Sequence, residues 1–378
     1  MADALADAKQ RLKSAIDRNA QRIFEPIAAD PWVVSSLLQK SIRRGETEIA
    51  QRAALTFFKL KGSAIWRRLM VIAFEDVGIG SVDALMMTVA ASSDTAWRRT
   101  CGTADRVAVH LASVLAEAPK DRSADFLVGA KDHPALATFA RTMATASLED
   151  RLSAVSNKLL ALPHRAIAAR FTSGLESRGQ VSRDKDSLDV LLKTFRELGA
   201  PEDLVVATGL AATRTREPIT AMVPLIWLAA KVSREVRVCD CPVPPMESAG
   251  NVPLYALDEH TRLGREAIWR FACENNRVRT GLESFVPASQ RRRAANVAAF
   301  YADAAPVARR LLWEQSSRLE TFGIDRDLLH AGVVPEGIAP LLEAVRSNLD
   351  HLNALRAQVL SRSRAVQATG PARRKAVP

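Results

Sequence analysis

The chain has 378 residues and a formal net charge of +11; hydrophobic residues make up 48% of it and aromatic residues only 5%. The apolar residues are mainly Ala, Leu and Val, and because Ala and Leu favour helices, this composition argues against a β-rich fold. The four cysteines have no disulfide-type spacing, and neither a secretory signal nor an apolar stretch of about 18 residues is visible. We therefore expect a cytoplasmic protein with no membrane span, either of two to three domains of roughly 150 residues each or of one elongated helical array.

The first half of the chain shows helical periodicity. Within residues 48–60, Ile49, Ala53, Phe57 and Leu60 fall on one face, as a period of about 3.6 residues requires. Glycines punctuate the pattern on both sides. Further helices are predicted at 64–75, 82–91, 95–116, 121–130, 134–144, 148–160 and 164–175.

The second half continues this pattern after residues 177–186, a polar stretch that we interpret as a surface connection and a domain boundary. Residues 236–253 hold four prolines and predict a long irregular loop. Residues 361–378 carry five cations and no acid, and they are too polar and basic to order themselves. Helices are predicted at 187–198, 201–213, 218–232, 261–273, 288–302, 306–319 and 335–360.

These patterns predict an all-α fold, a multi-helix array of antiparallel helix pairs with about fifteen to eighteen helices. We expect two helical domains, at residues 1–180 and 181–360, followed by the disordered basic tail at 361–378.

The common catalytic motifs are missing from the sequence. There is no P-loop, no dinucleotide fingerprint after a strand, no HExxH and no nucleophile elbow. Cys239, Cys241, Cys273 and His260 have unusual spacing for zinc, so we interpret these cysteines as buried or loop thiols. We expect no metal and no cofactor. The missing motifs favour a non-enzymatic protein over an enzyme.

A cationic segment, Q-K-S-I-R-R-G at 39–45, ends an early helix. Cations in a last turn complement the helix dipole and satisfy terminal carbonyls, which is the structural interpretation of Lys40, Arg43 and Arg44. The functional interpretation is a cationic surface that binds phosphate.

A second segment joins W-R-R-L at 66–69 to E-D-V-G at 75–78. Arg68 and Glu75 are seven residues apart and should share a helix face, so we predict that Arg67, Arg68, Glu75 and Asp76 form structural ion pairs. Adjacent helical residues point about 100° apart, which argues against a shared acid–base site at Glu75 and Asp76.

These two segments, followed by A-P-K at 118–120, resemble a run in the C-terminal half of the RarA/MgsA family. Those proteins are AAA+ ATPases related to clamp loaders that act at stalled replication forks. The resemblance covers residues 37–120 and departs at Asp121 and Arg122, where the family has Ser-Asn. It implies a helical oligomerisation module without the ATPase core, in which the charged residues of the motif are mainly structural.

A third cluster, residues 255–265, places Asp258, His260, Thr261 and Arg262 beside the proline-rich loop. Asp258 or Thr261 could be the N-cap of the next helix, with His260 at the surface. The alternative is a ligand site in which His260 and Arg262 bind an anion while Asp258 orients His260.

A fourth cluster consists of Arg291, Arg292 and Arg293 at a predicted helix start, with Arg309 and Arg310 about one helix later. Cations at a helix N-terminus oppose the dipole and cost stability unless an anion binds there. Few aromatics accompany these arginines, so contact with phosphates fits better than stacking on bases.

The sequence thus favours a non-enzymatic, DNA-associated accessory or scaffold protein of replication or recombination, without sequence specificity. The DNA-binding residues would be Lys40, Arg43, Arg44, Arg291, Arg292, Arg293, Arg309 and Arg310. One alternative is a protein–protein assembly module that never contacts DNA, and self-association fits either hypothesis. A third is an enzyme centred on Asp258 and His260.

Overall fold

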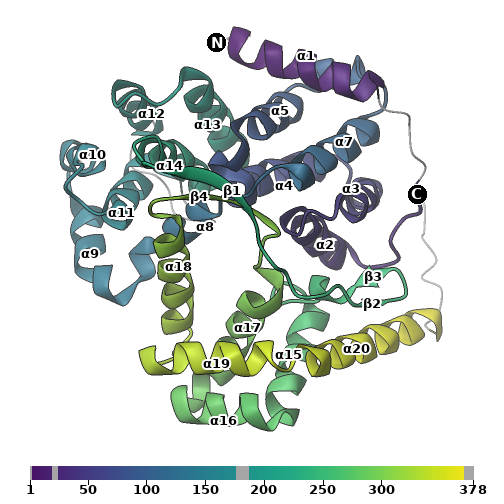
Figure 1. Ribbon diagram of the computed structural model, residues 1–378. Coiled ribbons are helices and arrows are strands. Elements are labelled where there is room, and N and C mark those ends of the chain that lie inside the picture. Colours follow the sequence, from purple (N-terminus) through teal and green to yellow (C-terminus); the bar gives the residue numbers. More distant parts are fainter. Residues whose placement is uncertain (1, 19–23, 176–186, 370–378) are drawn as a thin grey trace, which may run out of the picture. The chain divides into compact units, whose positions relative to one another are not determined.

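The computed structural model describes residues 2–18, 24–175 and 187–369 (Figure 1). Helices make up 75% of the chain and strands 4%, so the predicted all-α fold is confirmed. The chain forms two compact units that do not follow one another in sequence. Unit 1 comprises residues 1–27, 38–243 and 306–330, and unit 2 comprises 28–37, 244–305 and 331–378. The boundary expected near residue 180 therefore falls within the sequence of unit 1.

Unit 1 is built around apolar helices that are buried on all sides. Nearly every residue of α5 (Val82–Ser93) is buried, and this helix contacts α1, α4, α7 and α13. A helix without a polar face must be enclosed by others, and α14 (Met222–Ala230) follows the same rule. The helices of unit 1 are α1 (Ala2–Arg18), α3 (Thr47–Lys61), α4 (Ala64–Ile72), α5, α6 (Thr95–Arg99), α7 (Ala104–Glu117), α8 (Ser123–Val128), α9 (Ala137–Thr145), α10 (Leu148–Ser156), α11 (Leu162–Ser173), α12 (Ser187–Glu197), α13 (Glu202–Thr215), α14 and α18 (Ser316–His330).

Shorter helical turns connect the helices of unit 1. The stretch η1 (Ala73–Val77) is a π-helix that directly continues α4, and the 3₁₀ turn η2 (Gly78–Ser81) follows it. The remaining 3₁₀ turns are η3 (Ala130–Asp132), η4 (Pro134–Leu136) and η5 (Pro218–Ala221). Helix α2 (Pro31–Arg43) contributes residues to both units.

Unit 2 packs its helices around α15 (Arg262–Glu274), which contacts α16 (Asn276–Phe285), α17 (Arg291–Ala299) and α20 (Leu349–Thr369). Helix α17 continues into a second π-helix, η8 (Phe300–Ala304). The other elements are β2 (Ser248–Ala249), β3 (Val252–Pro253), η6 (Leu254–Ala256), η7 (Ala288–Gln290), η9 (Pro335–Gly337) and α19 (Ile338–Arg346).

Several element predictions were wrong. Residues 309–313, expected to be helical, form strand β4 (Arg309–Trp313), which pairs antiparallel with β1 (Val236–Asp240) inside the expected irregular loop. The single helix expected at 95–116 is divided into α6 and α7 around Gly102, which has a φ of +95°. Helix α20 runs to Thr369, well into the predicted disordered tail, while residues 370–378 lie outside the described residues.

Candidate functional site

The segments that carry the resemblance converge in unit 1, at the π-helix η1. We call the side chains that meet there the buried ion network. Its members are Gln39, Arg43, Arg68, Glu75, Asp76 and Arg122. They come from α2, α4, η1 and the residue before α8, so segments far apart in the sequence lie side by side.

Arg43 is the central cation of this network. Its Nε lies 2.5 Å from Asp76 Oδ1, and its Nη2 lies 2.8 Å from Glu75 Oε1. Gln39 Nε2 donates to both carboxylates at 2.7 Å. Although Glu75 and Asp76 are adjacent in the sequence, their two carboxylates share Arg43 and Gln39 as partners.

Further arginines complete the buried ion network. Arg68 Nη2 donates to Gln39 Oε1 at 2.5 Å, so Gln39 links Arg68 to Glu75. Arg122 Nε lies 3.2 Å from Asp76 Oδ1. Arg67 lies outside the network and pairs with Glu217 at 2.5 Å.

Burial and neighbouring charges shift the pKa values of the two carboxylates, Glu75 and Asp76, in opposite directions. Burial is the largest influence on Asp76 and by itself raises the pKa, but the adjacent Arg43 and Arg122 outweigh it and hold the pKa below 3.8. Burial, followed by the charges of Asp76 and Asp125, raises the pKa of Glu75 to about 7. Asp76 is therefore the more acidic of the two carboxylates, and the pKa of Glu75 lies near neutrality.

Close backbone contacts fix the network to the A-P-K segment. Asp121 N–H donates to the Val77 carbonyl at 3.1 Å, directly before Gly78. Gly78 has a φ of +50°, and a Cβ there would lie 2.6 Å from the Asp121 carbonyl oxygen. The Nζ of Lys120 donates to the Ala116 and Ala118 carbonyls, and burial lowers its pKa to about 7. These contacts join the E-D-V-G segment to the residues that follow A-P-K, and Lys120 is bound by carbonyls of its own segment.

The structure overturns the phosphate-binding role expected for the cations of α2. Lys40, Arg43 and Arg44 are 1%, 2% and 5% exposed. Arg43 faces Asp76 and Glu75, and Arg44 pairs with Glu46 at 2.9 Å. Side chains buried in this way cannot reach the backbone of a nucleic acid.

The arginines at the start of α17 have different environments. Arg291 donates to the Val286 and Glu283 carbonyls and so satisfies the end of α16. Arg292 is exposed, with its guanidinium 5.8 Å from the Trp269 ring, and Arg293 is also exposed. Two of the three arginines are thus available at the surface.

Arg309 and Arg310 lie on strand β4 of unit 1, not on a helix that follows the arginines of unit 2. Arg309 is exposed, whereas Arg310 pairs with Glu320. Of this pair, Arg309 is the one that has no carboxylate partner within the described ranges. Arg309 and Arg310 therefore belong to a different unit from Arg291, Arg292 and Arg293.

The cluster at 255–265 is a capped helix start. Thr261 is the N-cap of α15, because its hydroxyl accepts the Gly264 N–H at 3.0 Å. Asp258 is fully buried, and its Oδ1 accepts the His260 backbone N–H at 3.1 Å and the Ser36 hydroxyl at 3.3 Å. His260 and Arg262 are exposed. Asp258 thus holds the backbone of His260.

The described part of the chain holds no group of three or more His, Cys, Asp or Glu side chains that could bind a metal ion. No single helix there is long and apolar enough to cross a membrane, although the bent pair Ser316–His330 and Pro335–Arg346 meets the length and composition criteria together.

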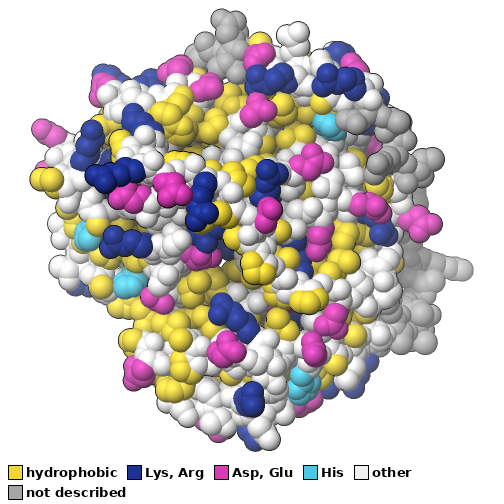
Figure 2. All heavy atoms as spheres, viewed as in Figure 1, with side chains coloured by type: hydrophobic (Ala, Val, Ile, Leu, Met, Phe, Trp, Pro, Cys, Tyr) yellow, Lys and Arg dark blue, Asp and Glu magenta, His cyan; other side chains and the backbone are white. Residues whose placement is uncertain are grey.

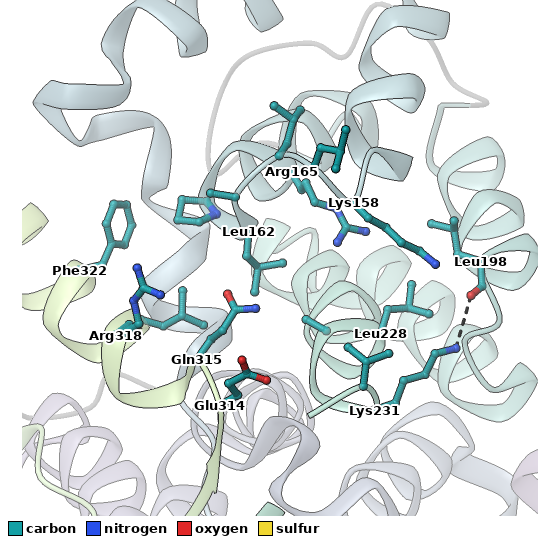
Figure 3. A pocket seen from close by; sticks show the side chains of 17 residues that line it. Lys158, Leu162, Arg165, Leu198, Leu228, Lys231, Glu314, Gln315, Arg318 and Phe322 are labelled. Carbon is teal, nitrogen blue, oxygen red and sulfur yellow. Dashed lines mark hydrogen bonds between the residues drawn. The ribbon is translucent and has the colours of Figure 1, made fainter. Parts of the chain in front are cut away.

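A pocket of about 660 Å³ opens in unit 1, and sequence reasoning missed it (Figure 3). Its residues come from the α10–α11 connection, α11, the ends of α12 and α14, and the start of α18. No local pattern marks such a site, because each element contributes only a few side chains. Its charged residues are Lys158, Arg165, Lys231, Glu314 and Arg318.

Comparison of the chain with protein-family models, with curated proteins and with solved structures finds no match.

Proposed function

We propose that this chain is a non-enzymatic, DNA-associated accessory or scaffold protein of replication or recombination. The resemblance of residues 37–120 to the RarA/MgsA helical region supports the pathway and suggests self-association. The use of the motif charges for internal pairing supports a structural module without catalysis. Phosphates would be contacted without reading the sequence of the bases.

The DNA proposal rests on the solvent exposure of Arg292, Arg293 and Arg309 and on their lack of carboxylate partners. All three are exposed, and none has a carboxylate partner within the described residues. On the face shown in Figure 2, basic and acidic side chains are interspersed, so unpaired arginines are the best contacts for a polyanion. Arg292 and Arg293 belong to unit 2 and Arg309 belongs to unit 1, so the pair and the single arginine are tested separately.

The test is fluorescence anisotropy of a labelled duplex with the full chain over a range of salt concentrations. Each phosphate contact that a substitution removes should reduce the salt slope by about one, so the double variant Arg292→Gln/Arg293→Gln should reduce it by about two. Arg309→Gln alone should reduce it by about one.

The matched control is Lys193→Gln/Arg196→Gln, which removes two charges already paired with Glu197 and Glu202 on and beside α12. It should leave the affinity nearly unchanged. Equal losses of DNA affinity in the control and in the Arg292/Arg293 variant would refute the assignment of these arginines as phosphate contacts. Absence of DNA binding by the wild type at low salt would refute it as well.

A second candidate function, protein–protein assembly, is favoured by strand β1. Val236 and Val238 are 51% and 42% exposed on this strand, which pairs with β4 and with no other described strand. An exposed edge strand can pair with another chain. Sedimentation velocity should show self-association that Val238→Lys abolishes; a monomer at all concentrations would exclude self-assembly through this edge.

A further inference from the structure

We propose that the pocket of unit 1 binds a small amphipathic anion, with a carboxylate or phosphate head and an apolar body (Figure 3). This activity is independent of DNA binding. The pocket volume of about 660 Å³ lies in the range of small-molecule sites.

The charge of the pocket is strongly one-sided. Lys158, Arg165, Lys231 and Arg318 line it together with a single acid, Glu314. In the described part of the chain, none of these four cations forms an ion pair with a carboxylate. Lys231 Nζ instead donates to the Gly199 carbonyl at 3.1 Å and lies 5.0 Å from the Trp227 ring. An anion in the pocket would find four cations and a single acid.

Arg165 is the most informative of these residues. It is only 8% exposed, and its Nε donates to the Val155 carbonyl at 2.8 Å. Burial lowers its pKa, and no acid compensates for that burial. A charge of low solvent exposure is stabilised by an opposite charge, so a ligand anion beside Arg165 would gain a favourable partner. In Figure 3 the guanidinium of Arg165 points into the pocket.

Apart from Gln315, the uncharged side chains that line the pocket are apolar. Leu162, Leu228, Leu319 and Phe322 line it, and Leu159 beside them is 96% exposed. Apolar surface of this kind is stabilised when a ligand covers it. Duplex DNA presents phosphates without an apolar body, so the combination of cations and leucines selects an amphipathic small molecule.

Isothermal titration calorimetry with the full chain tests this proposal. The probes are dodecanoate, dodecyl phosphate, dodecanol and inorganic phosphate, all below micelle-forming concentrations. At least one amphipathic anion should bind ten or more times more tightly than both dodecanol and inorganic phosphate. The comparison of dodecanoate with dodecyl phosphate identifies the preferred head group.

Arg165→Met should weaken binding of that probe at least tenfold, and Lys231→Met should weaken it severalfold. Lys193→Met, on the surface of α12, is the control and should bind like the wild type. If Arg165→Met does not fold, Lys158→Met/Lys231→Met replaces it, because both residues are exposed.

Equal binding of dodecanol and the anions would overturn the proposal, as would unchanged binding by the pocket variants or no binding of either anion. A duplex that displaces the probe, with DNA affinity abolished in Arg165→Met, would also overturn it by assigning the pocket to the DNA interface. The variant Arg292→Gln/Arg293→Gln should bind the probe like the wild type even if it no longer binds DNA.

Discussion

Arg43 and Asp76 form a buried ion pair in which Nε lies 2.5 Å from Oδ1, and the side chains are 2% and 0% exposed. The pair joins the end of α2 to the π-helix η1. A π-helix adds a residue to the turn, and π-helical turns often occur at functional sites. Here the two carboxylates of η1 both face Arg43, so the irregular turn serves the packing of unit 1.

The pH dependence of stability should reflect Glu75. Burial, together with the charges of Asp76 and Asp125, raises its pKa from 4.5 to about 7, so the folded protein binds the proton more tightly than the unfolded chain. The free energy of unfolding should therefore fall as the pH rises through this window. Urea unfolding of Glu75→Gln should show a flatter pH profile from about pH 5 to 7 than the wild type. Parallel profiles would show that Glu75 does not titrate there.

Gly78 should be intolerant of a side chain for two reasons: its φ is +50°, and the Asp121 carbonyl oxygen lies 2.6 Å from the position that a Cβ would take. Gly78→Ala should lower the free energy of unfolding by about 1–3 kcal/mol or more, measured by urea unfolding. Gly62 is the matched control, because its φ of +54° is similar but nothing lies within 4 Å of such a Cβ.

Gly62→Ala should therefore cost clearly less, since only the backbone strain remains. Equal losses of stability at the two glycines would mean that the close approach of Gly78 to Asp121 does not contribute to stability.

Arg356 should be essential to unit 2. It is fully buried, with Nη1 2.5 Å from Asp303 Oδ2 on η8 and Nε 2.9 Å from the Leu257 carbonyl. Arg356→Met leaves Asp303 without this partner and should cost about 3–5 kcal/mol.

The comparison is Arg196→Met, which breaks an ion pair with Glu202. The side chains of Arg196 and Glu202 are 38% and 59% exposed. Solvent screens that pair, and its removal should cost roughly 0–1 kcal/mol. Urea unfolding measures both variants, and similar losses of stability for Arg356 and Arg196 would contradict the structural role of the buried pair.

Local periodicity predicted the helices well because amphipathic helices are encoded within a few turns. The pattern at 48–60 corresponds to α3 (Thr47–Lys61). Of its predicted face, Ala53 and Phe57 are buried, whereas Ile49 is half-buried and Leu60 is 46% exposed. Strand β4 could not be predicted in this way. Its pairing depends on β1, about seventy residues earlier, and on the backbone of Lys120, whose N–H donates to the Arg309 carbonyl.

The candidate sites were harder to predict than the helices. The sequence indicated that Glu75 and Asp76 are structural, but it placed Arg43 at the surface because its acids lie more than thirty residues away. Lys158, Arg165 and Arg318 meet at the pocket from separate elements. Only the folded chain brings such residues together, so no spacing rule could have identified them.

A double-mutant cycle on Arg43 and Asp76 tests most directly whether the motif residues form a structural network. Arg43→Met and Asp76→Leu should each cost about 3–5 kcal/mol in urea unfolding, because each removes the closest opposite charge from a buried group; Asp76 would keep Arg122, and Arg43 would keep Glu75. The double variant should lose less than the sum of the two, with a coupling of about 1–3 kcal/mol. Single variants as stable as the wild type, or strictly additive losses, would contradict the structural role assigned to the buried ion network.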